Sequence, residues 1–203
     1  DDEFIRFGFY RNFIDAYERE YAGGNSRCDL LDVMRMMYAF HPTALNWPLR
    51  EDSMPSFKLE HLAKANNAFE GSAHEALSDV RSLINIARLV KNASPDLWQH
   101  ALSLRDKNNV SNKLAIHKNQ RILHVSGQFQ TAQACTGLML PILIHPQIKT
   151  RTIAIELRPE ALKLIDYSVD EIEKNIFTKY SELPEGEVRI GLKEIHHNRC
   201  PII

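Results

Sequence analysis

The spacing of apolar residues changes once along this chain, and that change limits the folds it can adopt. Up to about residue 104 the apolar positions recur every three or four residues, which is the period of amphipathic helices. From about residue 113 they gather in short runs bounded by turn residues such as Ser126 and Gly127, which is typical of β-strands. The sequence therefore predicts an α+β fold, with an α-rich part over residues 1–104 and a β-rich part over residues 105–203.

Caps and chain breaks locate the individual elements. In the α-rich part we expect helices over Phe4–Tyr17, Leu30–Phe40, a segment capped by Ser56, residues 73–90 and Leu97–Leu104. In the β-rich part we expect strands over Leu114–His117, Ile122–Val125, Leu138–Ile144, Thr152–Leu157 and Val188–Leu192. Ser168 with Glu171 three residues later is a capping-box signature, and it predicts a helix over Val169–Phe177.

Size, hydropathy and cysteine content argue against several classes of protein. The chain has 203 residues, 44% of them hydrophobic, which suits one large or two small soluble domains. Its longest apolar runs fall far short of the roughly 20 residues that a membrane helix needs, and its charged start argues against a signal peptide. Three cysteines without a C-x-x-C pair predict free thiols in a reducing, cytoplasmic environment rather than a disulfide framework or zinc site.

Charge is distributed unevenly although the net charge is only −1. Between Arg105 and Arg151 there are seven cations and one anion, whereas the segments on either side are net acidic. A basic stretch beside an acidic part is typical of a protein that handles a polyanion with metal ions. A solvated basic face without any ligand fits the same pattern, so charge alone leaves both interpretations open.

His74 and Asp79 stand five positions apart at the start of the long helix. As a bare pattern this spacing is weak, because chance alone supplies roughly half a match in a chain of this composition. A histidine at a helix N-terminus beside a solvated aspartate is the simpler interpretation of the pair alone. Its surroundings strengthen the signal, because the segment Gly71–Val80 resembles the third motif of the DEDDh exonucleases, in which such a pair lies on a helix beside the metal site.

Further segments extend this resemblance over most of the chain. They are Asp1–Glu3, Tyr10–Phe13, Ser26-Arg27, Asp29–Arg35, Asn46–Pro48, Pro55–Leu62, Lys64–Asn66, Ala73-His74, Asp79-Val80 and His124–Gly127. Together they resemble bacterial exonuclease I, a family of 3′→5′ exonucleases that degrade single-stranded DNA. The resemblance implies the C-terminal, mostly helical part of an RNase H-like exonuclease domain over residues 1–104, followed by a partial SH3-like β-barrel domain over residues 105–203.

The same resemblance implies an activity and its partners. It implies Mg²⁺-dependent hydrolysis of single-stranded DNA to 5′-mononucleotides, with two metal ions and roles in DNA repair and recombination. The implied partners are single-stranded DNA and the single-stranded DNA-binding protein, with no membrane, and the full-length enzyme is expected to be monomeric.

Three catalytic roles carry over by position. Asp79 matches a direct Mg²⁺ ligand, Asp1 matches a second metal-site carboxylate, and His74 matches the residue that takes a proton from the attacking water. The residue types suit these roles, because Mg²⁺ is held by carboxylates and water, and imidazole accepts protons near neutral pH.

One part of the family pattern is missing. The first family motif is an Asp-x-Glu on an apolar strand, and Asp1-x-Glu3 imitates its spacing without a preceding strand. We therefore expect that motif to be encoded ahead of residue 1, and the isolated chain, as a fragment, to be nearly inactive. The chain also stops before the family's remaining barrel residues and helical C-terminal domain.

The resemblance assigns DNA contacts to cations and aromatic side chains, which suit phosphates and unpaired bases. These residues are Arg6, Tyr17, Tyr21, Arg35, Phe57, Lys58 and Lys107. Core packing is the alternative for the three aromatic residues, and an ordinary surface position is the alternative for Arg35. Lys58 stands where the family usually has an arginine, so a fork of two donors becomes a point charge.

Two other functions stay open. A non-catalytic single-stranded DNA-binding or interaction module fits a chain with half of a metal site. An exonuclease that trims RNA ends is disfavoured, because the resemblance extends into the β-rich part. Without the family's N-terminal strands, the apolar face of the long helix is expected to lie exposed and to favour association.

Overall fold

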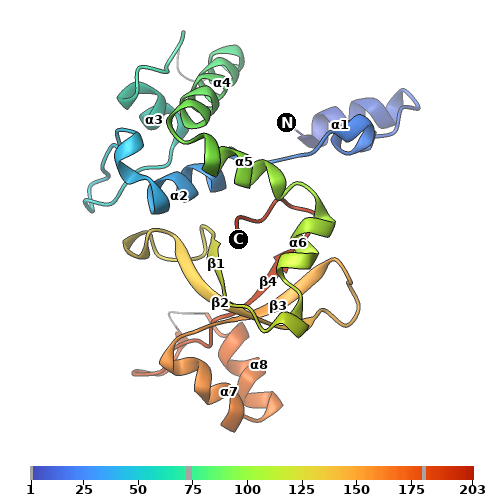
Figure 1. Cartoon of the computed structure of the whole chain (residues 1–203), viewed down its shortest axis with the longest axis vertical. Coiled ribbons are helices and arrows are strands. Elements are labelled where there is room, and N and C mark those ends of the chain that lie inside the picture. The colour runs from blue at the N-terminus through green and yellow to red at the C-terminus, as the bar shows by residue number, and fades with distance from the viewer. Residues whose placement is uncertain (1, 72–74, 180–181) are drawn as a thin grey trace.

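The computed structural model describes residues 2–71, 75–179 and 182–203 and confirms the α+β class (Figure 1). The α-helices in these ranges are α1 (Asp2–Arg11), α2 (Leu30–Phe40), α3 (Leu59–Ala65), α4 (Ala76–Ala93), α5 (Pro95–Ser103), α6 (Lys107–Lys113), α7 (Lys163–Asp166) and α8 (Val169–Phe177). The strands are β1 (Ile122–Val125), β2 (Thr136–Ile144), β3 (Arg151–Glu156) and β4 (Leu192–His196). Helices α1–α6 therefore precede the first strand, as the change in apolar spacing predicts, whereas α7 and α8 lie between β3 and β4.

The four strands form an antiparallel sheet in the order β1-β2-β3-β4. The chain end extends this sheet, because the Val125 N–H donates to the carbonyl oxygen of Ile202 at 3.0 Å beside β1. Helices α2–α5 lie toward one end of the molecule, and α7 and α8 lie toward the other, beyond the sheet (Figure 1).

One hydrophobic core joins the helices to the sheet. Met36 of α2 and Ile86 of α4 are fully buried in the same cluster as Met139 of β2 and Ile195 of β4. The C-terminus adds a second link, because the ring Nε2 of His100 on α5 lies 2.8 Å from the carbonyl oxygen of Ile203. The α-rich and β-rich parts are thus packed against each other.

Two helices begin at the predicted residues. The Asp29 carboxylate accepts the Leu31 N–H at 2.9 Å, which starts α2 at Leu30. The predicted capping box is also present, since Ser168 Oγ accepts the Glu171 N–H at 3.3 Å and the Glu171 carboxylate accepts the Ser168 N–H at 2.7 Å. Helix α8 therefore has the predicted bounds.

The boundaries of α1 and α3 differ from the prediction. Helix α1 ends at Arg11 rather than Tyr17, because Phe13 takes a left-handed backbone conformation with a φ of 57°. Helix α3 has Lys58 at its N-cap rather than Ser56. The Ser56 hydroxyl instead lies 2.8 Å from His61 Nδ1.

Two predicted strands are wrong or displaced. The run Leu114–His117 is not a strand, because Asp106 caps the unpredicted helix α6, whose C-terminal end takes up Leu114. The segment predicted as strand Val188–Leu192 is instead held by Asn175 of α8, whose side chain bonds Ile190 N at 2.7 Å and the carbonyl oxygen of Val188 at 3.3 Å. Pairing with β3 therefore begins only at Leu192.

Apolar side chains lie exposed on two helices. Helix α1 buries none of its residues, and α4 presents Leu77, Val80, Leu83 and Ile84 at 42–54% exposure. Such a contiguous apolar face on a surface helix is typical of a surface that another part of a protein covers. In the described ranges, no helix combines the length and apolar character needed to cross a membrane.

Candidate nucleic-acid interface

A cavity of about 870 Å³ lies where α2, the segment before α3 and the loop after β1 meet. Its lining is strongly basic: the described residues include four cations against the single carboxylate of Asp29. The cations are Arg27, Arg35, Arg50 and Lys58, and the aromatic side chains are Phe57 and Phe129. The cavity thus brings together three of the residues that the sequence predicts to contact DNA, namely Arg35, Phe57 and Lys58.

Arg35 is held in a fixed orientation from two sides. Its Nη1 lies 2.6 Å from Asp32 Oδ1, one turn earlier on α2, and only about a fifth of the side chain is exposed. On the other side its guanidinium approaches the backbone of Gly127, where an added Cβ would lie 2.5 Å from Nη2. Only glycine leaves room for this approach, so the turn after β1 packs directly against the guanidinium of Arg35.

Phe57 lines the cavity and is also packed from behind. Its ring meets Tyr38 and Trp47 edge-on, with centroid distances of 5.7 and 5.8 Å. Edge-to-face contacts of this kind fix a ring in place while leaving part of its surface available. Core packing and a place in the cavity wall are therefore compatible for Phe57, and exposed Lys58 follows it at the start of α3.

The loop after β1 contributes Phe129 to the cavity lining. The ammonium of Lys193 on β4 lies 5.0 Å from the Phe129 ring centroid and 2.5 Å from Ser126 Oγ. The pKa of Lys193 is lowered to about 8, chiefly by burial; nearby Arg35 acts in the same direction, whereas Asp32 opposes the shift. The partly buried ammonium of Lys193 therefore packs against the Phe129 ring.

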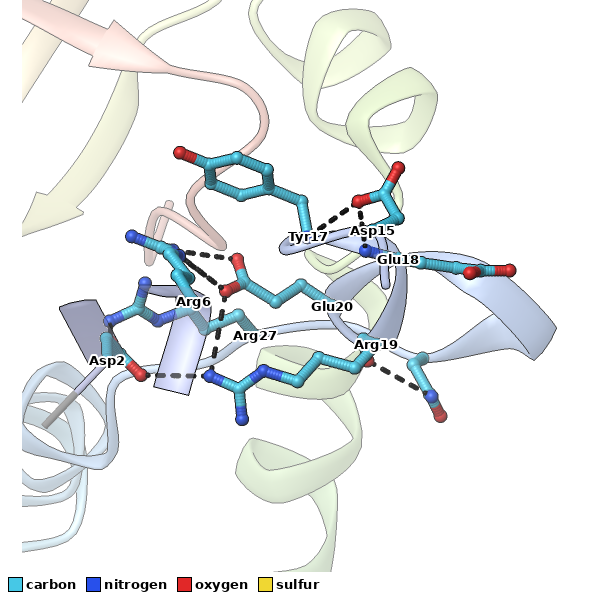
Figure 2. Close-up of polar contacts among 9 residues, drawn as sticks. Asp2, Arg6, Asp15, Tyr17, Glu18, Arg19, Glu20 and Arg27 are labelled. Carbon is cyan, nitrogen blue, oxygen red and sulfur yellow. Dashed lines mark hydrogen bonds and ion pairs between the residues drawn. The ribbon is translucent and has the colours of Figure 1, made fainter. Parts of the chain in front are cut away.

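A second group of predicted DNA contacts lies on the N-terminal segment (Figure 2). Arg6 forms a two-pronged ion pair with Glu20 at 2.8–3.1 Å, and its guanidinium lies 4.7 Å from the Tyr17 ring centroid. The hydrogen bonds that Arg6 donates to the Glu20 carboxylate raise the pKa of Arg6, which keeps the guanidinium charged and paired. Tyr21 is exposed beside this group. Arg27 joins the two groups, because it lines the cavity and pairs with Asp2 of α1.

The predicted catalytic residues are only partly described. Asp79 lies exposed in the first turn of α4, and no described side chain bonds its carboxylate. His74 and Asp1 lie outside the described residues. Within residues 2–71, 75–179 and 182–203, no group of three or more His, Cys, Asp or Glu side chains could hold a metal ion. Of the predicted catalytic residues, Asp79 alone is described, and the described residues form no complete metal centre.

Some residues of this interface are not apparent from the sequence, and one predicted contact lies elsewhere. Lys107 is the exposed first residue of α6 and is absent from the described cavity lining. Arg50 and Phe129 line the cavity but follow no motif, and only the neighbouring turn signals mark their segments. Arg27 belongs to a segment that carries the resemblance, so its position in the sequence could have identified it as a DNA contact.

The amino-acid sequence matches known proteins along its whole length. The family profile described as the exonuclease I SH3-like domain matches residues 105–203. The chain is 38% identical over 204 residues to exodeoxyribonuclease I of Haemophilus influenzae and 36% identical over 203 residues to that of Escherichia coli. All of this chain is covered in both comparisons, but it spans only 43% and 42% of those relatives.

The fold matches solved structures over the same span. Escherichia coli exonuclease I in complex with a dT13 oligonucleotide aligns with a TM-score of 0.92 at 36% identity, covering 99% of this chain and 43% of that one. The zinc-ion-bound form of the E. coli exonuclease I complex with single-stranded DNA gives a TM-score of 0.89 at 36% identity, with 99% and 42% coverage. The exonuclease I complex with SSB-Ct gives 0.87 at 36% identity, with 99% and 43% coverage.

Proposed function

Because this chain belongs to the exodeoxyribonuclease I family, we propose that it forms part of a cytoplasmic, Mg²⁺-dependent 3′→5′ exonuclease that degrades single-stranded DNA to 5′-mononucleotides. Residues 1–104 are assigned to the exonuclease domain and residues 105–203 to the SH3-like domain. The observation that carries this proposal is the basic cavity between them, where Arg35, Phe57 and Lys58 meet.

The cavity chemistry suits an unpaired strand without sequence preference. Guanidinium and ammonium groups neutralise phosphates, and aromatic faces such as Phe57 stack on any base. Binding of this kind weakens steeply with salt, because each neutralised phosphate releases counterions. The arrangement therefore supports DNA degradation that is indifferent to sequence.

The catalytic centre is proposed around Asp79. Its exposed carboxylate at the start of α4 is an oxygen ligand of the kind that Mg²⁺ prefers, and Asp1 would supply a second. When bound, two such ions supply a nucleophilic hydroxide and neutralise the leaving oxygen. His74 would accept the proton of the attacking water. Because this assignment gives only two carboxylates for two Mg²⁺ ions, we expect the isolated chain to bind DNA with almost no turnover.

DNA binding can be tested at Arg35. Arg35→Ala should weaken binding of a labelled oligothymidylate by about tenfold in fluorescence anisotropy at low salt, because a charged hydrogen bond contributes about 1.5–3 kcal/mol. The salt dependence should also lose about one unit of slope. The matched control is Arg88→Ala, an exposed arginine on α4 outside the described cavity lining. Equal affinities for both variants and the unchanged chain would reject the cavity as the DNA site.

A second candidate function is a non-catalytic DNA-binding module, which the basic cavity alone would also support. The full-length protein separates the two functions. If it is an exonuclease, it releases mononucleotides and Asp79→Asn abolishes release while binding persists. If the full-length protein binds single strands but releases no mononucleotides, it is a binding module.

The single-stranded DNA-binding protein is proposed as a partner, given the relative solved with SSB-Ct. A second cavity of about 390 Å³ is a suitable site for a C-terminal peptide. Its lining combines apolar side chains such as Phe40 and Leu97 with the cations Lys113 and Arg121. A terminal carboxylate is readily captured by such cations beside an apolar pocket.

A further inference from the structure

Cys28 and Cys200 come from opposite ends of the chain and meet at the wall of the DNA cavity. Cys28 is exposed, lies in the segment that leads into α2, and lines the cavity. Cys200 is buried in the C-terminal segment, and its Sγ lies 2.9 Å from the carbonyl oxygen of Arg27, the residue before Cys28. This contact places the Cys200 sulfur next to Cys28. The third cysteine, Cys135, is buried and free.

We propose that Cys28 and Cys200 form a reversible disulfide that fastens the C-terminal segment to the entrance of α2. The contact is suited to this bond, because the sulfur of Cys200 already lies against the backbone beside its partner. A disulfide between residues so distant in sequence constrains the unfolded chain strongly. The bond would join the α-rich part to the β-rich part. Its location beside the DNA cavity rests on the proposed function, but its formation does not.

The surroundings shift the pKa values of the two thiols in opposite directions. The contact with Cys28 and the nearby Arg105 lower the pKa of Cys200 against the opposing effect of burial. The same contact and the nearby Asp29 raise the pKa of Cys28. Cys200 is therefore the more easily ionised thiol of the pair. It donates to the Arg27 carbonyl oxygen in the structure and reacts with an oxidant once it has lost this proton.

Hydrogen peroxide is a sufficient oxidant for this reaction. The Cys200 thiolate attacks one peroxide oxygen, the O–O bond breaks, and the leaving hydroxide takes a proton to become water, which leaves a sulfenic acid on Cys200. The Cys28 sulfur then attacks the Cys200 sulfur, the S–O bond breaks, and a second water leaves with the Cys28 proton. Two thiols are oxidised, one peroxide is reduced to two waters, and a thiol reductant reverses the bond.

The test uses the whole chain and mass spectrometry without reduction. After peroxide treatment and tryptic digestion, peptide 28–35 should be linked to peptide 200–203, since arginine precedes both cysteines. Dithiothreitol should release the two peptides. The oxidised protein should melt roughly 5–10 °C higher than the reduced protein, as expected for a disulfide in a chain of this size.

Two variants give this experiment its controls. Cys28→Ser changes an exposed residue and should abolish both the linkage and the rise in Tm, whereas Cys135→Ser should preserve both. A linkage through Cys135, or oxidation of Cys28 to an acid without any linkage, would overturn the proposal. None of these readouts depends on DNA binding or nuclease activity, so the proposed function and this proposal can fail independently.

Discussion

The side chain of Arg35 shows how closely charge and backbone are fitted at this interface. Its guanidinium is held by Asp32 and pressed against Gly127, so the atoms that would meet a phosphate are set before any strand arrives. Such preorganisation reduces the entropy lost on binding. The contact across more than ninety positions of sequence also explains why local patterns could place Arg35 on a helix but could not foresee its neighbour.

Gly127→Ala tests this arrangement. The added methyl must displace the flexible end of Arg35 rather than the backbone, so Tm should change by no more than about 2 °C while DNA affinity falls several-fold. Gly8→Ala is the control, because its added methyl meets nothing within 4 Å. Thermal melts and anisotropy titrations measure the two effects. Equal DNA affinities for the two variants would show that the approach of Arg35 to Gly127 does not matter.

His124 predicts a pH dependence of stability. Burial, helped by Lys193, lowers its pKa from 6.5 to about 4, while its Nδ1 lies 2.7 Å from the carbonyl oxygen of Ile202. Between pH 6.5 and 4 the unfolded chain binds a proton at His124 that the folded chain does not, so stability falls as pH falls through this window. The free energy of unfolding should fall by about 3 kcal/mol across this window.

The variant that checks this is His124→Asn, whose amide can replace the Nδ1 donor but does not titrate. Denaturant unfolding at pH 6.5 and pH 4 should show a smaller loss for this variant than for the unchanged chain. His117→Asn, at an exposed position, should keep the original slope. A slope that is identical in all three proteins contradicts the assignment to His124.

At the scale of elements, the sequence predicted the start of a helix correctly where a single local signal determines it. The Ser168–Glu171 box placed the start of α8 correctly, because a cap bonds backbone groups only a few residues away. The same logic would have found α6 from Asp106. It could not find the start of β4, because that depends on Asn175, a side chain on another element.

Asn175→Ala should measure that dependence. Removing the amide leaves the Ile190 N–H and the Val188 carbonyl without this partner, which costs about 2–3 kcal/mol in the free energy of unfolding. Urea titrations followed by circular dichroism give this value. Asn92→Ala, at an exposed position on α4, should stay within about 0.5 kcal/mol of the unchanged chain. A cost for Asn175→Ala no larger than that control would show that β4 starts independently of α8.

The whole molecule is held together by a core that crosses the boundary near residue 104. The fold class and the change from an α-rich to a β-rich part followed from apolar spacing. The pairing of the C-terminal residues with β1 and α5 did not, because Ile202 and Ile203 carry no pattern of their own. The cavity arises from the same long-range packing, and only the family resemblance pointed to part of its lining.

Ile202→Ala tests the unity of this core. Ile202 is 3% exposed, so its truncation should lower the free energy of unfolding by about 2–4 kcal/mol. The chain should still unfold in a single transition, with a lower midpoint that is the same for all probes. Circular dichroism and tryptophan fluorescence should report the same midpoint. Ile165→Ala, on the exposed surface of α7, should leave it unchanged. Two separated transitions in the unchanged chain would mean that its two parts unfold independently.

Trp47 packs edge-on against Phe57, and Phe57 lines the DNA cavity. This places an intrinsic fluorophore one ring away from any strand that enters. Emission from Trp47 should therefore respond when a base stacks on Phe57, and replacing Trp98, the only other tryptophan, by phenylalanine would isolate that signal. The chain thus carries a built-in optical reporter, with which occupancy can be followed without attaching a dye to either partner.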